Sequence, residues 1–367
     1  MRFLIAPDKY KGTLTAREAA QAIARGVRAA CTGRNITPEI DLCPLSDGGE
    51  GFLDVMAEAY SACIEHFDTT DPLGNSITVP VGFTGEENNH AIVESALIIG
   101  LQLVPPDKRN PEQLSTRGLG TLLLDLAHKG STKVIIGLGG SATIDGGIGM
   151  ASALGYRFLD ANKTELPAIG ASLTQIVRIE RPQSNPLDGV RITAACDVDN
   201  SLLGDHGAAR TYGPQKGASP EQVDRLDAGL TKLLRIASAD DRTFLGAAGG
   251  VPFALSTCAG SSLQGGAQTV LDAVRFRDRA GRTDLTLTGE GSFDAQTSHA
   301  KVCAAVVDQS GAPVVALPGR LALEADTRAF AAIHPCTHLG APPPSSPADA
   351  ADRLTRAAHH ALLSFLS

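Results

Sequence analysis

The chain has 367 residues, enough for about two domains, and its 43% hydrophobic and 20% charged residues are typical of a globular protein. No run of about 18 apolar residues occurs and the net charge of −8 comes with no basic cluster, which disfavours membrane-spanning proteins and nucleic-acid binders. The seven cysteines form no CxxC pair, which argues against a disulfide framework or a zinc ribbon. No signal peptide is evident, so we expect a cytoplasmic monomer or homodimer without nucleic-acid or membrane partners.

The first 60 residues predict alternating strands and helices. The apolar run Arg2–Asp8 predicts a strand, and Thr15–Ala30 predicts a helix that begins with a threonine cap and a glutamate three residues on. Ile40–Leu45 predicts a second strand, and Gly51–Tyr60 a second helix. This β-α-β-α order is typical of a parallel sheet.

The middle of the chain differs in character. Strands with period-two patterning are expected at Asn75–Phe83 and Ala91–Ser95, followed by a helix over Gly118–Lys129 and a strand at Lys133–Leu138. A further helix is expected over Gly149–Gly155, after a glycine-rich loop.

The last part returns to the α/β pattern. Strands are expected at Asp284–Thr288 and Val314–Leu317, and helices over Lys301–Gln309 and Ala348–Leu366. We therefore expect an α/β lobe made of both chain ends, interrupted by a second α/β lobe.

Ligands of open α/β sheets bind beyond the carboxyl ends of the strands, where five loops of this chain combine glycines with charged residues. In the first, APDKYKG, Asp8 and Lys11 could position a hydroxyl and a phosphate, or belong to a solvated turn. In the second, PLSDGGEG, Asp47 precedes Gly48 and Gly49, which would let the backbone approach a ligand closely or simply make a turn.

The third loop, LGGSATIDGGIG, has five glycines in twelve residues between a strand and a helix. Glycine density of this kind suits a phosphate cradle of backbone N–H groups, although a tight structural connection is the alternative. The loop matches neither GxxxxGKS/T nor GxGxxG, so a Walker-type loop is excluded and a dinucleotide fingerprint is unsupported. Its candidate binding residues are Gly139, Gly140, Ser141, Thr143 and Asp145.

The last two loops add further carboxylates. The fourth has Asp197 after a strand and Lys216 in a later GPQKG turn, and the fifth has Glu290 and Asp294 after the strand DLTLT. Carboxylates at strand ends can bind Mg²⁺ or accept a hydroxyl proton, whereas exposed acids in capped loops are the alternative. The pair His359–His360 lies on the last helix and is expected to be solvated surface.

The five loops share Asp, Glu, Lys, Gly, Ser and Thr, which are the residue types of Mg²⁺-dependent phosphoryl transfer. The absence of a GxSxG motif gives acyl transfer little support. A non-catalytic sugar-acid sensor is one alternative, and a nicotinamide oxidoreductase is disfavoured because no glycine fingerprint follows the first strand.

The same loops resemble, in order and over nearly the whole chain, those of the bacterial glycerate kinase family, of the glycerate 2-kinase type. The segments that carry the resemblance include APDKYKGTLTAREAAQAIARG, PLSDGGEG, STRGLG, GLGGSATIDGGIGMASALGYRF, ACDVDNSLLG, GPQKGASPEQV and LTGEGSFDAQT. The resemblance implies ATP-dependent phosphorylation of D-glycerate, at the 2-hydroxyl in most close relatives, in a cleft between two α/β domains. We expect a Rossmann-like parallel-sheet domain at 1–66 and 280–367, and an inserted α/β domain at 67–279.

The resemblance also implies ATP and Mg²⁺ as cofactors, and we assign the candidate residues to catalysis, metal binding or substrate and phosphate binding. Asp47, Asp197 and Lys11 are the catalytic candidates, and Glu290 and Asp294 the metal ligands. The substrate- and phosphate-binding candidates are Asp8, Gly48, Gly49, Gly139, Gly140, Ser141, Thr143, Asp145 and Lys216.

The sequence also departs from the family's usual pattern. Where relatives usually read APDSFKGS and GEGRxDGQT, this chain has Lys9, Tyr10 and Thr13 in the first motif and Ser292, Phe293 and Ala295 in the second. The fifth loop therefore lacks an arginine, and the substrate carboxylate would be bound by Arg210, Arg320 or Lys301, or the acceptor would be another hydroxy acid related to glycerate.

Overall fold

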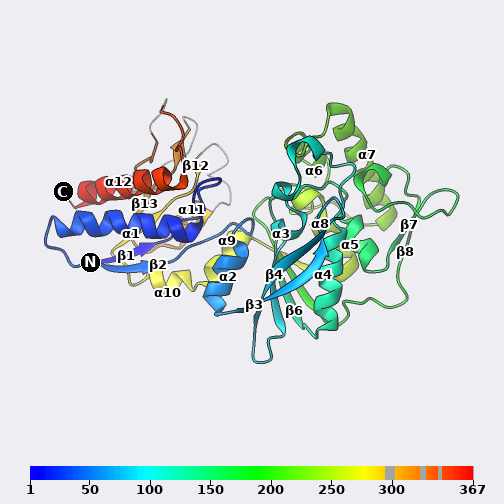
Figure 1. Cartoon of the computed structure of the whole chain (residues 1–367), viewed down its shortest axis with the longest axis horizontal. Coiled ribbons are helices and arrows are strands. Elements are labelled where there is room, and N and C mark those ends of the chain that lie inside the picture. The colour runs from blue at the N-terminus through cyan, green and yellow to red at the C-terminus, as the bar shows by residue number, and fades with distance from the viewer. Residues whose placement is uncertain (294–301, 323–327, 338–340, 367) are drawn as a thin grey trace. The chain divides into compact units, whose positions relative to one another are not determined.

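The computed structural model describes residues 1–293, 302–322, 328–337 and 341–366 (Figure 1). The chain divides into two compact units. The terminal unit comprises residues 1–47 and 267–367, and the inserted unit comprises residues 48–266.

The terminal unit is built on a five-stranded parallel sheet in the order β15-β13-β11-β1-β2. Its strands are β1 (Arg2–Ile5), β2 (Glu39–Leu42), β11 (Leu285–Thr288), β13 (Val314–Ala316) and β15 (Ala332–Ile333). The central strand β11 is buried throughout, whereas the edge strand β2 is mostly exposed and carries two acidic residues. Two short strands, β12 (Ser292–Phe293) and β14 (Arg320–Leu321), form a separate parallel pair.

Helices flank this sheet: α1 (Ala16–Thr32), α9 (Gly266–Ala273), which starts at the boundary between the units, α10 (Phe276–Ala280), α11 (Val302–Gln309) and α12 (Pro347–Phe365). Thr15 and Glu18 form the expected capping box at the start of α1. The apolar faces of α1 and α12 lie against each other in the core, side by side in Figure 1. Thr355 Oγ1 also donates to Ala22 O across this contact, at 3.0 Å.

The inserted unit contains a six-stranded mixed sheet in the order β10-β9-β6-β5-β4-β3. Its strands are β3 (Cys63–Thr70), β4 (Ser76–Thr84), β5 (His90–Glu94), β6 (Lys133–Gly137), β9 (Arg191–Ala195) and β10 (Ser262–Gln264). Strands β3, β4 and β5 are antiparallel neighbours, and β5, β6, β9 and β10 are parallel. The carboxyl ends of β6 and β9 therefore lie next to each other.

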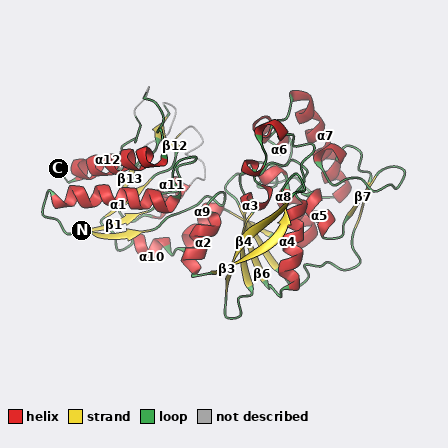
Figure 2. Ribbon diagram, in the orientation of Figure 1, coloured by secondary structure: helices red, strands yellow, loops and turns green. Residues whose placement is uncertain are grey.

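Helices surround this sheet, with α4 beside β3 and α2 beside β4 and β5 (Figure 2). The helices are α2 (Phe52–Tyr60), α3 (Ala96–Ile99), α4 (Arg117–His128), α5 (Ile148–Ala153), α6 (Ala208–Tyr212), α7 (Pro220–Ala237) and α8 (Val251–Ala259). An antiparallel pair, β7 (Arg157–Leu159) and β8 (Arg178–Glu180), completes the unit. Among the described residues, no helix combines the length and the apolar character that crossing a membrane requires.

The α/β fold class is confirmed, and the helices and strands named from the sequence are present with small shifts at their ends. Helices α6 to α10 were not foreseen, although the sequence marks the start of α7: Ser219 and Gln222 form a capping box, and Pro220 is the first helical residue. The expected domain boundaries differ from the boundaries of the two observed units. The expected boundary after His66 would divide β3, whose pairing with β4 begins at Cys63. The expected boundary after Arg279 would divide α10. Residues 48–66 belong with the inserted unit because α2 packs on β4 and β5.

Candidate active site

Four of the predicted site residues of the terminal unit line one cavity. Three loops at the carboxyl ends of β1, β2 and β11 contribute to it, and its volume is about 580 Å³. We call it the acidic pocket. Its charged lining includes Asp8, Lys9, Lys11, Asp47, Glu290 and Arg320.

An ion-paired lysine organises the carboxylates of the acidic pocket. Lys9 Nζ lies 2.9 Å from Asp47 Oδ1 and 3.6 Å from Asp8 Oδ2, and Lys9 N donates to Asp8 Oδ1 at 2.6 Å. Burial raises the pKa of Asp8 well above its usual range, Asp47 and Glu290 raise it further, and Lys9 opposes them. Asp8 therefore shares the acidic pocket with two further carboxylates, those of Asp47 and Glu290.

The residues that depart from the family pattern have definite places in the terminal unit. Tyr10 is buried and donates its hydroxyl to Leu317 O at 2.5 Å, and Phe293 is buried in strand β12. Arg320 is exposed and lines the acidic pocket, so it could bind a substrate carboxylate there. Asp294, Ala295 and Lys301 lie outside the described residues.

In the inserted unit, two glycine-bearing loops pack against each other. A Cβ added at Gly139, just after β6, would lie 2.7 Å from Gly49 Cα. Gly48 has φ +91°, and a Cβ there would lie 2.8 Å from Ala195 O at the end of β9. Asp197 follows β9 two residues later and is half-buried. Side chains at these glycines would therefore push apart the loops that predicted site residues occupy.

Lys216 is buried beneath the third loop. Its side chain is 3% exposed, and Nζ donates to Ser141 Oγ and to Thr143 O, each at 2.8 Å. Burial lowers the pKa of Lys216 to about 7, although Asp145 opposes the change. The structure thus brings three predicted residues, 75 positions apart in the case of Ser141 and Lys216, into direct contact.

Asp145 is fully buried and is held by the protein itself. Its Oδ2 accepts from Thr116 N, Thr116 Oγ1 and Gly149 N, and its Oδ1 accepts from Gly147 N, at 2.7 to 3.2 Å. Burial raises its pKa and these donors lower it. The sequence predicts a ligand-binding carboxylate at this position, and in the structure its four hydrogen bonds tie the glycine loop to the start of α4.

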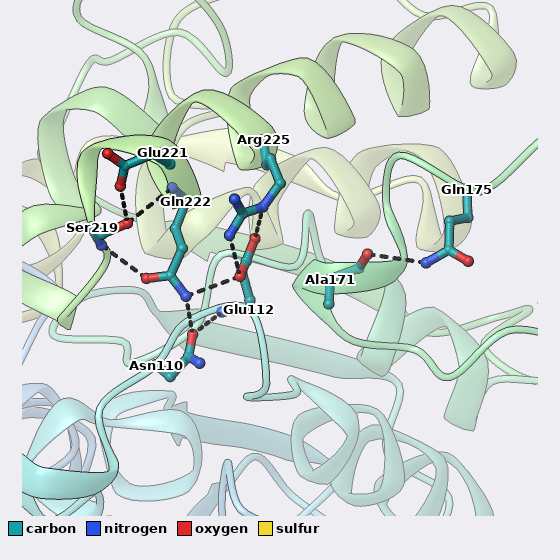
Figure 3. Close-up of polar contacts among 8 residues, drawn as sticks. All are labelled: Asn110, Glu112, Ala171, Gln175, Ser219, Glu221, Gln222 and Arg225. Carbon is teal, nitrogen blue, oxygen red and sulfur yellow. Dashed lines mark hydrogen bonds and ion pairs between the residues drawn. The ribbon is translucent and has the colours of Figure 1, made fainter.

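A second polar cluster, which sequence reasoning missed, braces the segment before α4 against α7 (Figure 3). Glu112 accepts from Arg225 Nε at 2.9 Å, Arg225 Nη2 at 3.0 Å and Gln222 Nε2 at 2.9 Å, and Gln222 also bonds Asn110. The hydrogen bonds from Arg225 lower the pKa of Glu112. The cluster joins residues more than 100 positions apart, so no local pattern could reveal it.

Arg210, one of the candidates for the substrate carboxylate, is engaged elsewhere. Its guanidinium lies 3.2 Å from Asp224 and 3.3 Å from Asp227 on α7. Both partners are in the inserted unit. Of the candidates named for the substrate carboxylate, Arg320 is the one that the structure describes in the lining of the acidic pocket.

The carboxylates of the acidic pocket are suitable ligands for Mg²⁺. Among the described residues, no three His, Cys, Asp or Glu side chains form a ready metal cluster. Mg²⁺ is, however, commonly held by only one or two carboxylates together with substrate phosphates and water. The carboxylates of Asp8, Asp47 and Glu290, which line one cavity, fit that description.

The fold and the loops together define the class of protein: an α/β enzyme whose strand-end loops supply the carboxylates, lysines and glycines of phosphoryl transfer. Comparison with known proteins makes this specific. The model of the glycerate kinase family matches residues 3–365. A glycerate kinase from Haemophilus influenzae is 39% identical over 333 residues, which cover 88% of this chain and 86% of that protein.

Two further relatives agree. A glycerate 2-kinase from Escherichia coli strain K12 is 38% identical over 333 residues, with coverage of 88% and 86%. A crystal structure from Salmonella typhimurium LT2, attributed to glycerate kinase 2, is 34% identical and superposes with a TM-score of 0.79 over 100% of this chain and 98% of that one. The chain belongs to the glycerate kinase family.

The resemblance and the enzyme class expected from the sequence are therefore confirmed, and kinase membership implies the use of ATP and a small-molecule acceptor. These matches give no support to a non-catalytic sensor. The roles of individual site residues stay predictions.

Proposed function

We propose that this chain transfers the γ-phosphoryl group of ATP to the 2-hydroxyl of D-glycerate, giving 2-phosphoglycerate and ADP. The observation that carries the proposal is the acidic pocket, where Asp8, Lys9 and Asp47 meet at the carboxyl ends of parallel strands in a chain of the glycerate kinase family. ATP is the donor, so we place the reaction in the cytoplasm.

Phosphoryl transfer requires that the acceptor hydroxyl lose its proton as its oxygen forms the new bond to phosphorus. Asp47 is our first candidate to take that proton, because its carboxylate lines the acidic pocket and is held by Lys9. Asp197 at the end of β9 is the second candidate. The bond between the γ-phosphorus and the bridging oxygen breaks, and ADP leaves with that electron pair.

The transferring group carries negative charge, which the protein must offset. In the terminal unit the candidate for this role is Lys11. In the inserted unit the candidates are Lys216 and the backbone N–H groups of the loops at Gly48–Gly49 and Gly139–Gly147. Ser141 and Thr143 hold Lys216 in place through its ammonium hydrogens. In this scheme Asp145 positions the loop and does not touch the substrate.

Mg²⁺ would be held by Glu290 and Asp8 of the acidic pocket, with Asp294 of the same loop as a further candidate ligand. When bound, the ion neutralises charge on the phosphates. Arg320, which lines the same pocket, is our candidate for the glycerate carboxylate.

The missing arginine of the fifth loop keeps a second acceptor open, a hydroxy acid related to glycerate. Phosphorus NMR of the product made from ATP and D-glycerate tests both the activity and the position, because 2- and 3-phosphoglycerate have different spectra. Two deoxy analogues sharpen the test: 2-hydroxypropanoate lacks the 3-hydroxyl and 3-hydroxypropanoate lacks the 2-hydroxyl. Transfer to the first alone supports the proposal, whereas transfer to the second or formation of 3-phosphoglycerate contradicts it.

A further inference from the structure

The terminal unit holds a second cavity, of about 510 Å³, that the scheme above does not use. Four of the side chains that line it can carry positive charge, and among the described lining residues there is no carboxylate. We call it the basic pocket. The four residues are His334, Arg353, Arg356 and His360.

Two rigid elements form the basic pocket. Arg353, Arg356 and His360 recur at intervals of three and four on α12, so they share one face of that helix, which packs on α1 through its apolar side (Figure 1). His334 directly follows β15, and its N–H donates to Ala316 O at 2.9 Å. The backbone positions that carry these side chains are therefore fixed by helix packing and by the sheet.

The positive charge of the basic pocket is only partly compensated. Arg353 makes a two-pronged contact with Asp349, at 3.0 Å from Nε and 2.9 Å from Nη2, and donates Nη1 to Pro342 O at 2.9 Å. Burial lowers the pKa of His334, and the neighbouring His360 lowers it further, so the His334 ring loses its proton more readily and contributes an N–H donor more than a positive charge. Asp349 forms its ion pair with Arg353. Within the described part of the chain, no carboxylate lines the pocket beside Arg356, His334 or His360.

The basic pocket adjoins the acidic pocket. Cys336, Thr337 and Arg353 line both cavities. Thr337 N–H donates to Gly319 O at 3.1 Å, which ties this shared wall to the turn before Arg320. Because the two cavities share this wall, one ligand could occupy both, with a phosphate among the cationic groups of the basic pocket.

We propose that the basic pocket binds the phosphate group of a small anionic ligand. Guanidinium groups bind phosphate through paired N–H donors. Arg356 presents such a pair, whereas the paired donors of Arg353 face Asp349, and the rings of His334 and His360 each add an N–H donor. The ligand is either a nucleotide or a phosphorylated acid. The inference does not rest on the proposed function, because none of these four residues has a role in it and binding requires no turnover.

Calorimetric titration of the full chain with inorganic phosphate, ADP and 2-phosphoglycerate tests the assignment. Arg356 is exposed, so Arg356→Gln is expected to fold normally and to raise the Kd of at least one probe by about tenfold. Arg356→Lys should recover part of the affinity. Arg28→Gln, at an exposed position on α1, removes the same charge from the same unit and should leave every Kd unchanged.

The pattern of losses distinguishes the sources. A loss for ADP alone assigns the basic pocket to the nucleotide, a loss for 2-phosphoglycerate alone assigns it to the phosphorylated acid, and a loss for inorganic phosphate as well confirms the shared chemistry. NMR gives a second readout, since bound phosphate should shift the ring resonances of His334 and His360. Unchanged affinities in Arg356→Gln for all three probes, no binding by the wild type, or unmoved histidine resonances would overturn the proposal.

Discussion

Replacing Lys216 by methionine separates the electrostatic role of this side chain from its packing. Methionine is also unbranched, so it can fill the space without a charge. In the wild type the ammonium is 3% exposed and has two acceptors, Ser141 Oγ and Thr143 O. The charge is costly to bury, and burial accordingly lowers the pKa of Lys216 from 10.5 to about 7.

The sign and size of the effect follow from proton linkage. Between pH 7 and 10.5 the unfolded chain binds a proton at Lys216 that the folded chain has released, so stability rises with pH in this window. At about 1.4 kcal/mol for each pKa unit, the full difference is roughly 5 kcal/mol. Lys216→Met abolishes this dependence, but it leaves two buried acceptors without a donor, at about 1–3 kcal/mol each.

The free energy of unfolding in urea, measured at intervals from pH 7 to pH 10, checks the reasoning. At pH 7 we expect Lys216→Met to be within about 2 kcal/mol of the wild type, because the two effects nearly cancel. By pH 10 the wild type should have gained roughly 4 kcal/mol relative to the variant. Lys232→Met is the matched control, since Lys232 Nζ donates to Thr174 O at the surface of the same unit.

The pH dependence of kcat/KM for ATP tests the role of Lys216 independently of stability. If ionised Lys216 binds phosphate, kcat/KM for ATP should fall above pH 7 in the wild type, and Lys216→Met should lower it by about 10²-fold or more without that pH dependence. A stability difference that stays constant from pH 7 to pH 10 would refute the desolvation argument. A variant with near-normal kcat/KM would refute the role in phosphate binding.

Three further predictions concern the same loops. In a coupled assay, Asp47→Asn should lower kcat by about 10²-fold if Asp47 accepts the hydroxyl proton. The control Asp41→Asn removes an ion-paired carboxylate from the same unit and should change kcat little. Gly139→Ala places a methyl group 2.7 Å from Gly49 and should lower kcat/KM at least tenfold with an unchanged circular dichroism spectrum; Gly311→Ala, with open space around it, is the control. Excess EDTA should abolish turnover and added Mg²⁺ should restore it, and full activity in EDTA would exclude a metal requirement.

The sequence determined those features that depend on neighbours a few positions apart. The capping box at Thr15 and Glu18 is one, because helix caps are made within one turn. The loops that follow β1, β6 and β11 are others, since an apolar run that ends in glycines and carboxylates marks the carboxyl end of a strand. The ordered motifs in these loops were sufficient to indicate the family.

Only the tertiary structure decided how those residues are used. It buried Lys216 against Ser141 and thereby changed its pKa, and it directed all four contacts of Asp145 to the protein. It also joined Glu112 to Arg225 across 113 positions. Burial and long-range hydrogen bonds depend on which segments pack together, and the periodicity of one segment carries no information about its distant partners.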